Sequence, residues 1–219
     1  MNRDCGIERM SKDAIRRKYE GMAKWYDAQD SIYELLAVGK LRADLIPRAS
    51  GKILEVAAGT GKNFEYYPVR SHITAIDNSP AMIAQARKKA QKVNSEVELR
   101  IMDAEELTFP NESFDTVVST LTGCTFPDPE KVYREMIRVC RPNGRILLIE
   151  HGVSSVSWLS FVQHKLAKAY YKKYACLWNR DALTPIRSLG LRIAHTRVSF
   201  FGIFHAFQLH KSSESTASD

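Results

Sequence analysis

A short apolar run that leads into a turn of small residues constrains the fold of this 219-residue chain more than any other feature. Residues 53–56 are apolar except for Glu55, and Ala57-Ala58-Gly59-Thr60-Gly61 follows them. A second run, residues 72–76, ends at Asp77, twenty-two positions after Glu55. The glycines alone would also suit a plain strand-to-helix turn. In open α/β sheets, however, such a turn lets backbone approach a ligand, and such an acid binds two ribose hydroxyls. The spacing therefore predicts a site for an adenosine-type cofactor.

The composition predicts one folded domain. With 44% hydrophobic residues, the chain can bury a core without metals or disulfides. We expect a single domain at 12–211, between a disordered N-terminus at 1–11 and a disordered tail at 212–219. Residues 1–10 are polar, and no apolar run approaches the roughly 18 residues of a membrane span. The expected location is cytoplasmic, without a signal peptide.

The hydrophobic pattern alternates between strands and helices, which predicts a doubly wound α/β fold with a mostly parallel sheet. Seven strands are expected, the last two as an antiparallel hairpin joined near Gly202: 52–56, 72–76, 96–102, 115–120, 145–150, 192–199 and 203–210. An amphipathic helix is expected at 12–27. Two further helices should begin at Ser79-Pro80 and Asp128-Pro129, where a polar residue caps the first turn and proline fits it. The second should bury Cys140 and end at Pro142-Asn143-Gly144.

Five motifs follow one another along this framework. They are residues 55–61, Asp77, Met102-Asp103-Ala104-Glu105, residues 114–118 and residues 139–145. With this series the chain resembles the class I S-adenosylmethionine-dependent methyltransferases, over roughly residues 15–210. Ala57 departs from the pattern, because many members have glycine there, although alanine also occurs in quinone-methylating members.

The resemblance implies a Rossmann-like methyltransferase fold and S-adenosylmethionine as the cofactor. It assigns Asp77 to the ribose, and Asp103 with the Ala104 backbone to the adenine; a solvated helix start is the alternative explanation of Asp103. Tyr19 and Tyr26 are expected to fold over the cofactor, although core packing explains their spacing equally well. Because the methyl group is already activated, catalysis should rest mainly on alignment. The expected cofactor-binding residues are Tyr19, Tyr26, Glu55, Ala57, Gly59, Thr60, Gly61, Asn63, Asp77, Asn78, Met82, Asp103, Ala104, Glu105 and Thr120.

The segment after the fourth strand bears on the acceptor. Thr120 is followed by Leu121-Thr122-Gly123-Cys124, and not by the N/D-P-P-F/Y turn of enzymes that methylate planar bases or amides. We therefore expect neither nucleic-acid bases nor glutamine side chains as acceptors. No cluster of acids with an amide suggests magnesium. The four cysteines form no C-x-x-C pair: Cys5, Cys124, Cys140 and Cys176. Reduced thiols and no metal are expected.

Within the family, the chain is similar to bacterial phospholipid N-methyltransferases, ubiquinone/menaquinone methyltransferases and animal methyltransferase-like thiol enzymes. The pair Tyr26-Asp27, residues 61–68 and Glu150-His151-Gly152 carry this resemblance. It implies a small apolar or amphipathic acceptor: a phospholipid headgroup amine of the phosphatidylethanolamine type or a quinone precursor, with a small thiol as the alternative. His151 follows a strand end and is either the catalytic base or a structural histidine.

A basic segment lies near the end of the chain. Residues 151–211 carry nine Lys or Arg and one acid. Within an expected amphipathic basic helical insertion at about 154–180, an apolar stripe lies beside four lysines: Trp158, Leu159, Val162, Leu166 and Tyr170, with Lys165, Lys168, Lys172 and Lys173. This pattern suits peripheral contact with an anionic membrane, and equally an ordinary surface helix. Nucleic acid is not expected, because no stacking platform for bases is evident.

Two other classes of protein compete with methyl transfer. A nicotinamide-dependent oxidoreductase would need the spaced glycines of the dinucleotide fingerprint, where this chain has Ala57 and Ala58. A non-catalytic nucleotide-binding module would not need to retain Asp77 and Asp103. The sequence therefore favours a methyltransferase.

Overall fold

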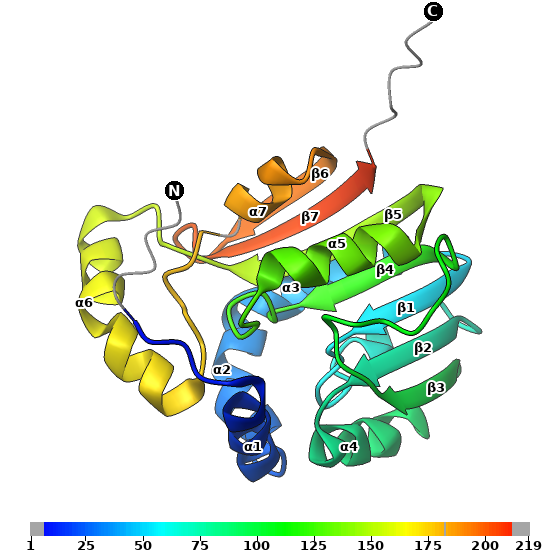
Figure 1. The fold of residues 1–219 in the computed structure, drawn as a ribbon, viewed down its shortest axis with the longest axis horizontal. Coiled ribbons are helices and arrows are strands. Elements are labelled where there is room, and N and C mark those ends of the chain that lie inside the picture. Colours follow the sequence, from blue (N-terminus) through cyan, green and yellow to red (C-terminus); the bar gives the residue numbers. More distant parts are fainter. Residues whose placement is uncertain (1–6, 182, 212–219) are drawn as a thin grey trace, which may run out of the picture.

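The computed structural model describes residues 7–181 and 183–211, which are built around one mixed sheet (Figure 1). Its strand order is β3-β2-β1-β4-β5-β7-β6. Strands β1 to β5 are parallel, whereas β7 is antiparallel to both β5 and β6. The strands are β1 Lys52–Val56, β2 His72–Asp77, β3 Glu96–Ile101, β4 Phe114–Thr120, β5 Cys140–His151, β6 Leu191–Ser199 and β7 Phe204–Lys211. The predicted seven-stranded sheet with its C-terminal antiparallel pair is confirmed.

Helices cover both faces of this sheet. Those that pack on one face are α3 Gly39–Leu45 and α4 Pro80–Ala90; those on the other are α5 Pro129–Val139 and α7 Leu183–Ser188. Three more, α1 Lys12–Met22, α2 Tyr26–Tyr33 and α6 Ser157–Tyr174, lie on the side toward which the parallel strands point (Figure 1). Short turns complete the helical segments: a π-helical turn Glu34–Val38 and 3₁₀ turns Ile46–Arg48 and Phe64–Tyr66.

Two hydrophobic cores lie on opposite faces of the sheet. Successive residues of β1 point into different cores, because side chains alternate along a strand. Ile53 packs with Leu45 of α3, whereas Leu54 packs with Val132 of α5, and all four are fully buried. Each such burial contributes about 1.5–3 kcal/mol. The strand order reverses between β1 and β4, and ligands bind at such a reversal, beyond the carboxyl ends of the strands.

The two predicted helix starts are confirmed by their capping bonds. Ser79 Oγ accepts a hydrogen bond from the Met82 amide at 3.3 Å. Asp128 Oδ1 accepts one from the Lys131 amide at 3.0 Å. In each case proline follows the cap, where its missing N–H leaves no bond unmade. These caps fix where the chain leaves the carboxyl edge of the sheet.

The predicted helix at 12–27 is wrong in extent. Helix α1 ends at Met22, one residue after Gly21, which weakens a helix. The Trp25 amide then donates to the Met22 carbonyl at 2.9 Å, and α2 begins at Tyr26. The segment from 26 to 48 is helical almost throughout, which the sequence analysis did not assign.

The end of α5 also differs from expectation. The helix ends at Val139, and Cys140 begins β5 instead of continuing the helix. Cys140 pairs with Phe114, and Arg145 pairs with Thr116, so residues 141–144 bulge out of the ladder opposite Asp115. Gly144 is required there, because a Cβ would lie 2.9 Å from the Asp115 carbonyl oxygen.

Helix α6 is rotated so that a polar side chain faces the protein, while part of the predicted apolar stripe is exposed. Its buried residues are Gln163, Ala167 and Tyr171, whereas Trp158 is 69% and Leu166 48% exposed. The buried amide of Gln163 explains this rotation. Its Oε1 accepts from the Ser154 amide at 2.8 Å, and its Nε2 donates to the Gly152 and Trp178 carbonyls at 3.1 and 3.3 Å.

Two further predictions concern disorder at the chain termini and the absence of a membrane span. Residues 1–6 and 212–219, where disorder was predicted, lie outside the described residues. Residues 7–11 are placed, and the Met10 amide donates to the Tyr171 hydroxyl at 2.8 Å. Among the helices of the described chain, none is long and apolar enough to cross a membrane.

Candidate active site

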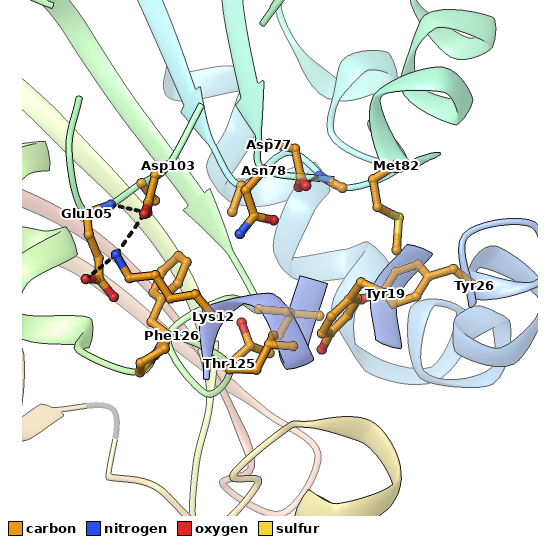
Figure 2. Close-up of a pocket in the computed structure, with 16 residues that line it drawn as sticks. Lys12, Tyr19, Tyr26, Asp77, Asn78, Met82, Asp103, Glu105, Thr125 and Phe126 are labelled. Carbon is orange, nitrogen blue, oxygen red and sulfur yellow. Dashed lines mark hydrogen bonds and ion pairs between the residues drawn. The ribbon is translucent and has the colours of Figure 1, made fainter. Parts of the chain in front are cut away.

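A cavity lies at the carboxyl ends of β1 and β2, between the sheet and helices α1 and α2 (Figure 2). Ten of the fifteen predicted cofactor residues line it: Tyr19, Tyr26, Ala57, Gly59, Asp77, Asn78, Met82, Asp103, Ala104 and Glu105. The sequence analysis did not anticipate the other wall residues, which are Lys12, Ile15, Leu121, Thr125, Phe126 and Pro127. We call this space the cofactor cavity.

Asp77 joins the two loops at the centre of the cofactor cavity. Its Oδ2 accepts from the Gly59 amide and its Oδ1 from the Ser79 amide, each at 2.8 Å. A carboxylate has about four lone-pair sites, so both oxygens retain capacity for two ribose hydroxyls. Burial raises the pKa of Asp77, while the two amides act in the opposite direction. The residue therefore serves the loops and is also available to a ligand.

The small-residue turn has an unusual backbone conformation at Ala57, where many family members have glycine. Ala57 has φ +52°, in the left-handed region that glycine adopts easily and alanine adopts at a cost of about 1–2 kcal/mol. The next amide, Ala58 N–H, donates to the Ile76 carbonyl at 2.9 Å and ties the turn to β2. This bond holds the turn open beside Asp77.

A salt bridge crosses the side of the cavity that Asp103 and Glu105 line. Lys12 Nζ on α1 lies 2.7 Å from Asp103 Oδ2 and 2.7 Å from Glu105 Oε2 (Figure 2). Asp103 Oδ1 accepts from the Glu105 amide at 2.9 Å. Burial raises the pKa of Asp103, but the hydrogen bonds from Lys12 and the Glu105 amide, with the charges of Lys12 and Lys131, together outweigh burial and hold the pKa below its usual range. Lys12 is separated from Asp103 by 91 positions, and no sequence pattern linked them.

The five remaining predicted residues lie outside the cavity walls: Glu55, Thr60, Gly61, Asn63 and Thr120. Most of them belong to a buried polar network. Asn63 Nδ2 donates to Glu55 Oε1 at 2.9 Å and to Thr120 Oγ1 at 3.0 Å. Thr60 Oγ1 instead donates to Asp27 at 2.6 Å. These hydrogen bonds stabilise the small-residue turn at residues 57–61.

Arg42 is a member of this network that the sequence analysis missed. Its Nη1 donates to Asn63 Oδ1 at 2.6 Å and to Thr120 Oγ1 at 2.8 Å. Its Nη2 donates to Glu34 Oε1 at 2.8 Å. Arg42 and Glu34 both come from the helical segment that the hydrophobic pattern did not assign, so no sequence signal pointed to them.

A second, larger cavity of about 570 Å³ adjoins the first and shares Tyr19, Tyr26 and Leu121 with it. Eighteen residues line it, and eight are aromatic: Tyr19, Tyr26, Tyr33, Tyr170, Tyr174, Trp178, Phe200 and Phe204. The rings of Tyr170 and Trp178 stack with centroids 4.4 Å apart. None of the lining residues is Asp, Glu, Lys or Arg. We call this space the acceptor cavity.

His151, predicted as a candidate base, lines the acceptor cavity and not the cofactor cavity. Its Nε2 lies 3.1 Å from Cys176 Sγ. Burial lowers the pKa of His151, but Cys124 and Glu150 outweigh burial and raise the pKa to about 8. The neighbouring Glu150 is 2% exposed, and burial raises its pKa to about 7.

Comparison with known proteins identifies the family. The family model described as "Methyltransferase domain" matches residues 54–148. Phosphatidylethanolamine N-methyltransferase of Cereibacter sphaeroides is 37% identical over 161 residues, which cover 73% of this chain and 78% of that protein. The chain belongs to the class I S-adenosylmethionine-dependent methyltransferases.

Two further comparisons extend this assignment. Human thiol S-methyltransferase TMT1A is 35% identical over 128 residues, 56% of this chain, and the chain spans only 52% of its length. A solved structure of a SAM-dependent methyltransferase from Thermotoga maritima, titled a possible histamine N-methyltransferase, has TM-score 0.68 at 18% identity and covers 90% of this chain and 99% of that chain. This methyltransferase therefore uses S-adenosylmethionine, and the oxidoreductase and the non-catalytic module are set aside.

Replacing Asp77 should weaken cofactor binding. Asp77→Ala removes the charged acceptor assigned to the ribose, so we expect an S-adenosylmethionine affinity lower by roughly 2 kcal/mol, or about 30-fold. Isothermal titration calorimetry measures it. Asp77→Asn keeps one amide acceptor for the loops and should fall between the two. Equal affinity in all three proteins would remove Asp77 from the site.

The buried carboxyl of Glu55 should make stability depend on pH. Burial raises its pKa from 4.5 to about 7, so its protonated form is favoured in the folded state. Its stabilising contribution is complete below pH 4.5 and is lost as the pH rises through 7, by up to about 1.4 kcal/mol per pH unit. Urea unfolding of Glu55→Gln between pH 5 and 8 should show a shallower decline than the wild type. The control is Glu65→Gln, at an exposed position. If the stability of Glu55→Gln declines with pH as steeply as that of the wild type, the assignment to Glu55 is contradicted.

Proposed function

We propose that this enzyme methylates the headgroup amine of an aminophospholipid of the phosphatidylethanolamine type. The acceptor cavity is the observation that carries the proposal, because it adjoins the cofactor cavity and has aromatic walls that contain no Asp, Glu, Lys or Arg. A relative of similar length, the Cereibacter sphaeroides protein, is named for this reaction and supports it.

The chemistry of an amine acceptor suits these walls. An ammonium group is attracted to aromatic faces by about 0.5–2 kcal/mol, and this attraction needs no buried carboxylate. In the transfer, the amine nitrogen forms a bond to the methyl carbon while the bond from that carbon to the cofactor sulfur breaks. The ammonium must first lose a proton to expose its lone pair. His151 is our candidate for the group that accepts it.

The cofactor assignments enter this proposal with the same roles. Asp77 is proposed to bind the ribose, and Asp103 with Ala104 the adenine, next to the Lys12 ammonium. Tyr19 and Tyr26 are proposed to lie between cofactor and acceptor, since both cavities include them. Their ring centroids are 6.1 Å apart, and Figure 2 shows Met82 directed toward them.

The surface around the acceptor cavity favours access from a lipid surface. On α2, Ile32 lines the cavity and is 64% exposed, and Leu35 in the following turn is 79% exposed. On α6, Trp158 and Phe161 flank the cavity residue Leu159 in sequence and are also exposed. Exposed lysines accompany them on α6: Lys165, Lys168, Lys172 and Lys173. Apolar side chains beside lysines suit a cytoplasmic protein that binds an anionic membrane peripherally.

Methylation of a small thiol is the second candidate. The pKa of His151, near 8, is close to the ordinary pKa of a thiol, so its neutral form can accept the thiol proton, and no carboxylate among the cavity walls would repel the thiolate. The human relative named for thiol methylation supports this alternative.

A labelled methyl donor should identify the acceptor. We expect label from S-adenosylmethionine to enter phosphatidylethanolamine vesicles, and not a quinol precursor or small thiols. Thin-layer separation of the lipid products measures it, and Asp77→Ala serves as the low-activity control. Label found only in the thiol fraction would transfer the proposal to the second candidate, and label only in the quinol would overturn both.

Vesicle binding should depend on the lysines of α6. Replacing Lys165, Lys168, Lys172 and Lys173 with Gln should reduce sedimentation with anionic vesicles, and salt should weaken wild-type binding, because surface charges are screened over about 8–10 Å. A matched variant loses the same amount of charge at positions outside α6. In it, Arg87 and Lys88 of α4, Lys92 just after α4, and Arg134 of α5 are changed to Gln. Equal sedimentation of the two variants would contradict the membrane role of α6.

A further inference from the structure

Three side chains of metal-binding type meet at the wall of the acceptor cavity. Cys124 Sγ lies 3.3 Å from Cys176 Sγ, which lies 3.1 Å from His151 Nε2. All three ligand atoms are within 4.8 Å of one another. The sulfur separation is much longer than a disulfide bond of about 2.05 Å, so both cysteines are thiols. We propose that Cys124, His151 and Cys176 bind one Zn²⁺ ion whose fourth coordination position opens toward the acceptor cavity.

The distances between these atoms suit a tetrahedral zinc ion. Zinc bonds of about 2.3 Å to sulfur and about 2.0 Å to nitrogen separate neighbouring ligands by roughly 3.5–3.8 Å. The observed 3.3 and 3.1 Å require small outward movements of the side chains, and the third pair, Cys124 and His151, lies within 4.8 Å. Two thiolates balance the charge of the ion, and a sulfur and imidazole ligand set selects zinc over magnesium or calcium.

The backbone holds the three ligands in place independently of a metal. Ala175 has φ +53° at the end of α6, and this left-handed turn redirects the chain at Cys176. The Leu177 amide then donates to the Cys124 carbonyl at 3.0 Å. His151 is fixed at the end of β5 by its pairing with Phe204 of β7. A site that is already assembled loses less freedom when the ion binds.

The arrangement leaves one side of the proposed ion free. Cys124 and Cys176 are 4% and 8% exposed, yet both line the acceptor cavity together with His151. Three protein ligands with an open position are the pattern of catalytic zinc sites, whereas structural sites have four. Water or a polar group of the acceptor would complete the coordination.

This inference goes beyond the proposed function and does not depend on which acceptor is methylated. It does change the role of one residue. An imidazole Nε2 that binds zinc cannot also accept a proton, so His151 is the base only in metal-free protein. No sequence pattern indicated the site, because its ligands are 27 and 25 positions apart and come from three separate segments.

Metal content and cobalt spectroscopy test the proposal. The full chain is treated with a chelator, loaded with Zn²⁺, desalted and analysed by mass spectrometry of the metal. We expect about one zinc per chain. Co²⁺ in its place should give the thiolate-to-metal absorption of a tetrahedral sulfur site. Cys124→Ser, Cys176→Ser and His151→Gln should each lose zinc retention.

Two controls separate this site from other thiols. Cys140 is buried outside the cluster, with its Sγ donating to the Arg145 carbonyl, so Cys140→Ser should retain zinc. Cys5→Ser should also retain it. Wild type that holds no zinc, or a cobalt spectrum without thiolate absorption, would overturn the proposal even if a variant fails to fold. If the intact mass of the wild type is two hydrogens below that of the reduced chain, and the mass of Cys124→Ser is not, a disulfide between Cys124 and Cys176 replaces the zinc proposal. None of these measurements uses methyl transfer, so their failure leaves the proposed function untouched.

Discussion

The buried guanidinium of Arg42 is the interaction on which the rest of the site depends. It joins Glu34 in the N-terminal helical segment to Asn63 beyond the first turn and to Thr120 at the end of β4. Arg42 is 3% exposed, and leaving such a buried hydrogen-bonding group without its partner costs about 1–3 kcal/mol, and more when the group is charged. Because the N-terminal helices contribute residues to the walls of both cavities, this one side chain helps to set the position of each.

The two cavities divide the electrostatic requirements of methyl transfer. Acids line the cofactor cavity, and the S-adenosylmethionine that it must hold carries a positive sulfonium. Two of these three acids, Asp103 and Glu105, are paired with Lys12, so the charge is partly compensated before the cofactor binds. The acceptor cavity has aromatic walls and no carboxylate, which avoids burying an unpaired charge. Tyr19, Tyr26 and Leu121 line both cavities, so the two spaces adjoin one another there.

Much of the cofactor side could be predicted from the sequence, and little of the acceptor side. The small-residue turn, Asp77 and Asp103 are each adjacent to a strand end, and a parallel sheet brings consecutive strand ends to one edge. Ten predicted residues accordingly line one cavity. The acceptor cavity instead combines α2, α6 and the β6–β7 turn, which are far apart in sequence. The orientation of α6 also involves the buried amide of Gln163, which the apolar stripe in the sequence did not indicate.

The sequence by itself determined the strands, the caps at Ser79 and Asp128, and the adenosine-type turn, because each depends on residues only a few positions apart. Only the tertiary structure decided which distant side chains meet. Lys12 reaches Asp103, Arg42 reaches Thr120, and Cys124 meets His151 and Cys176. The physical reason is that periodicity and capping are local properties of the backbone, whereas these contacts depend on the path of the chain between them. That path is set by the sum of many packing contacts, and no short pattern records it.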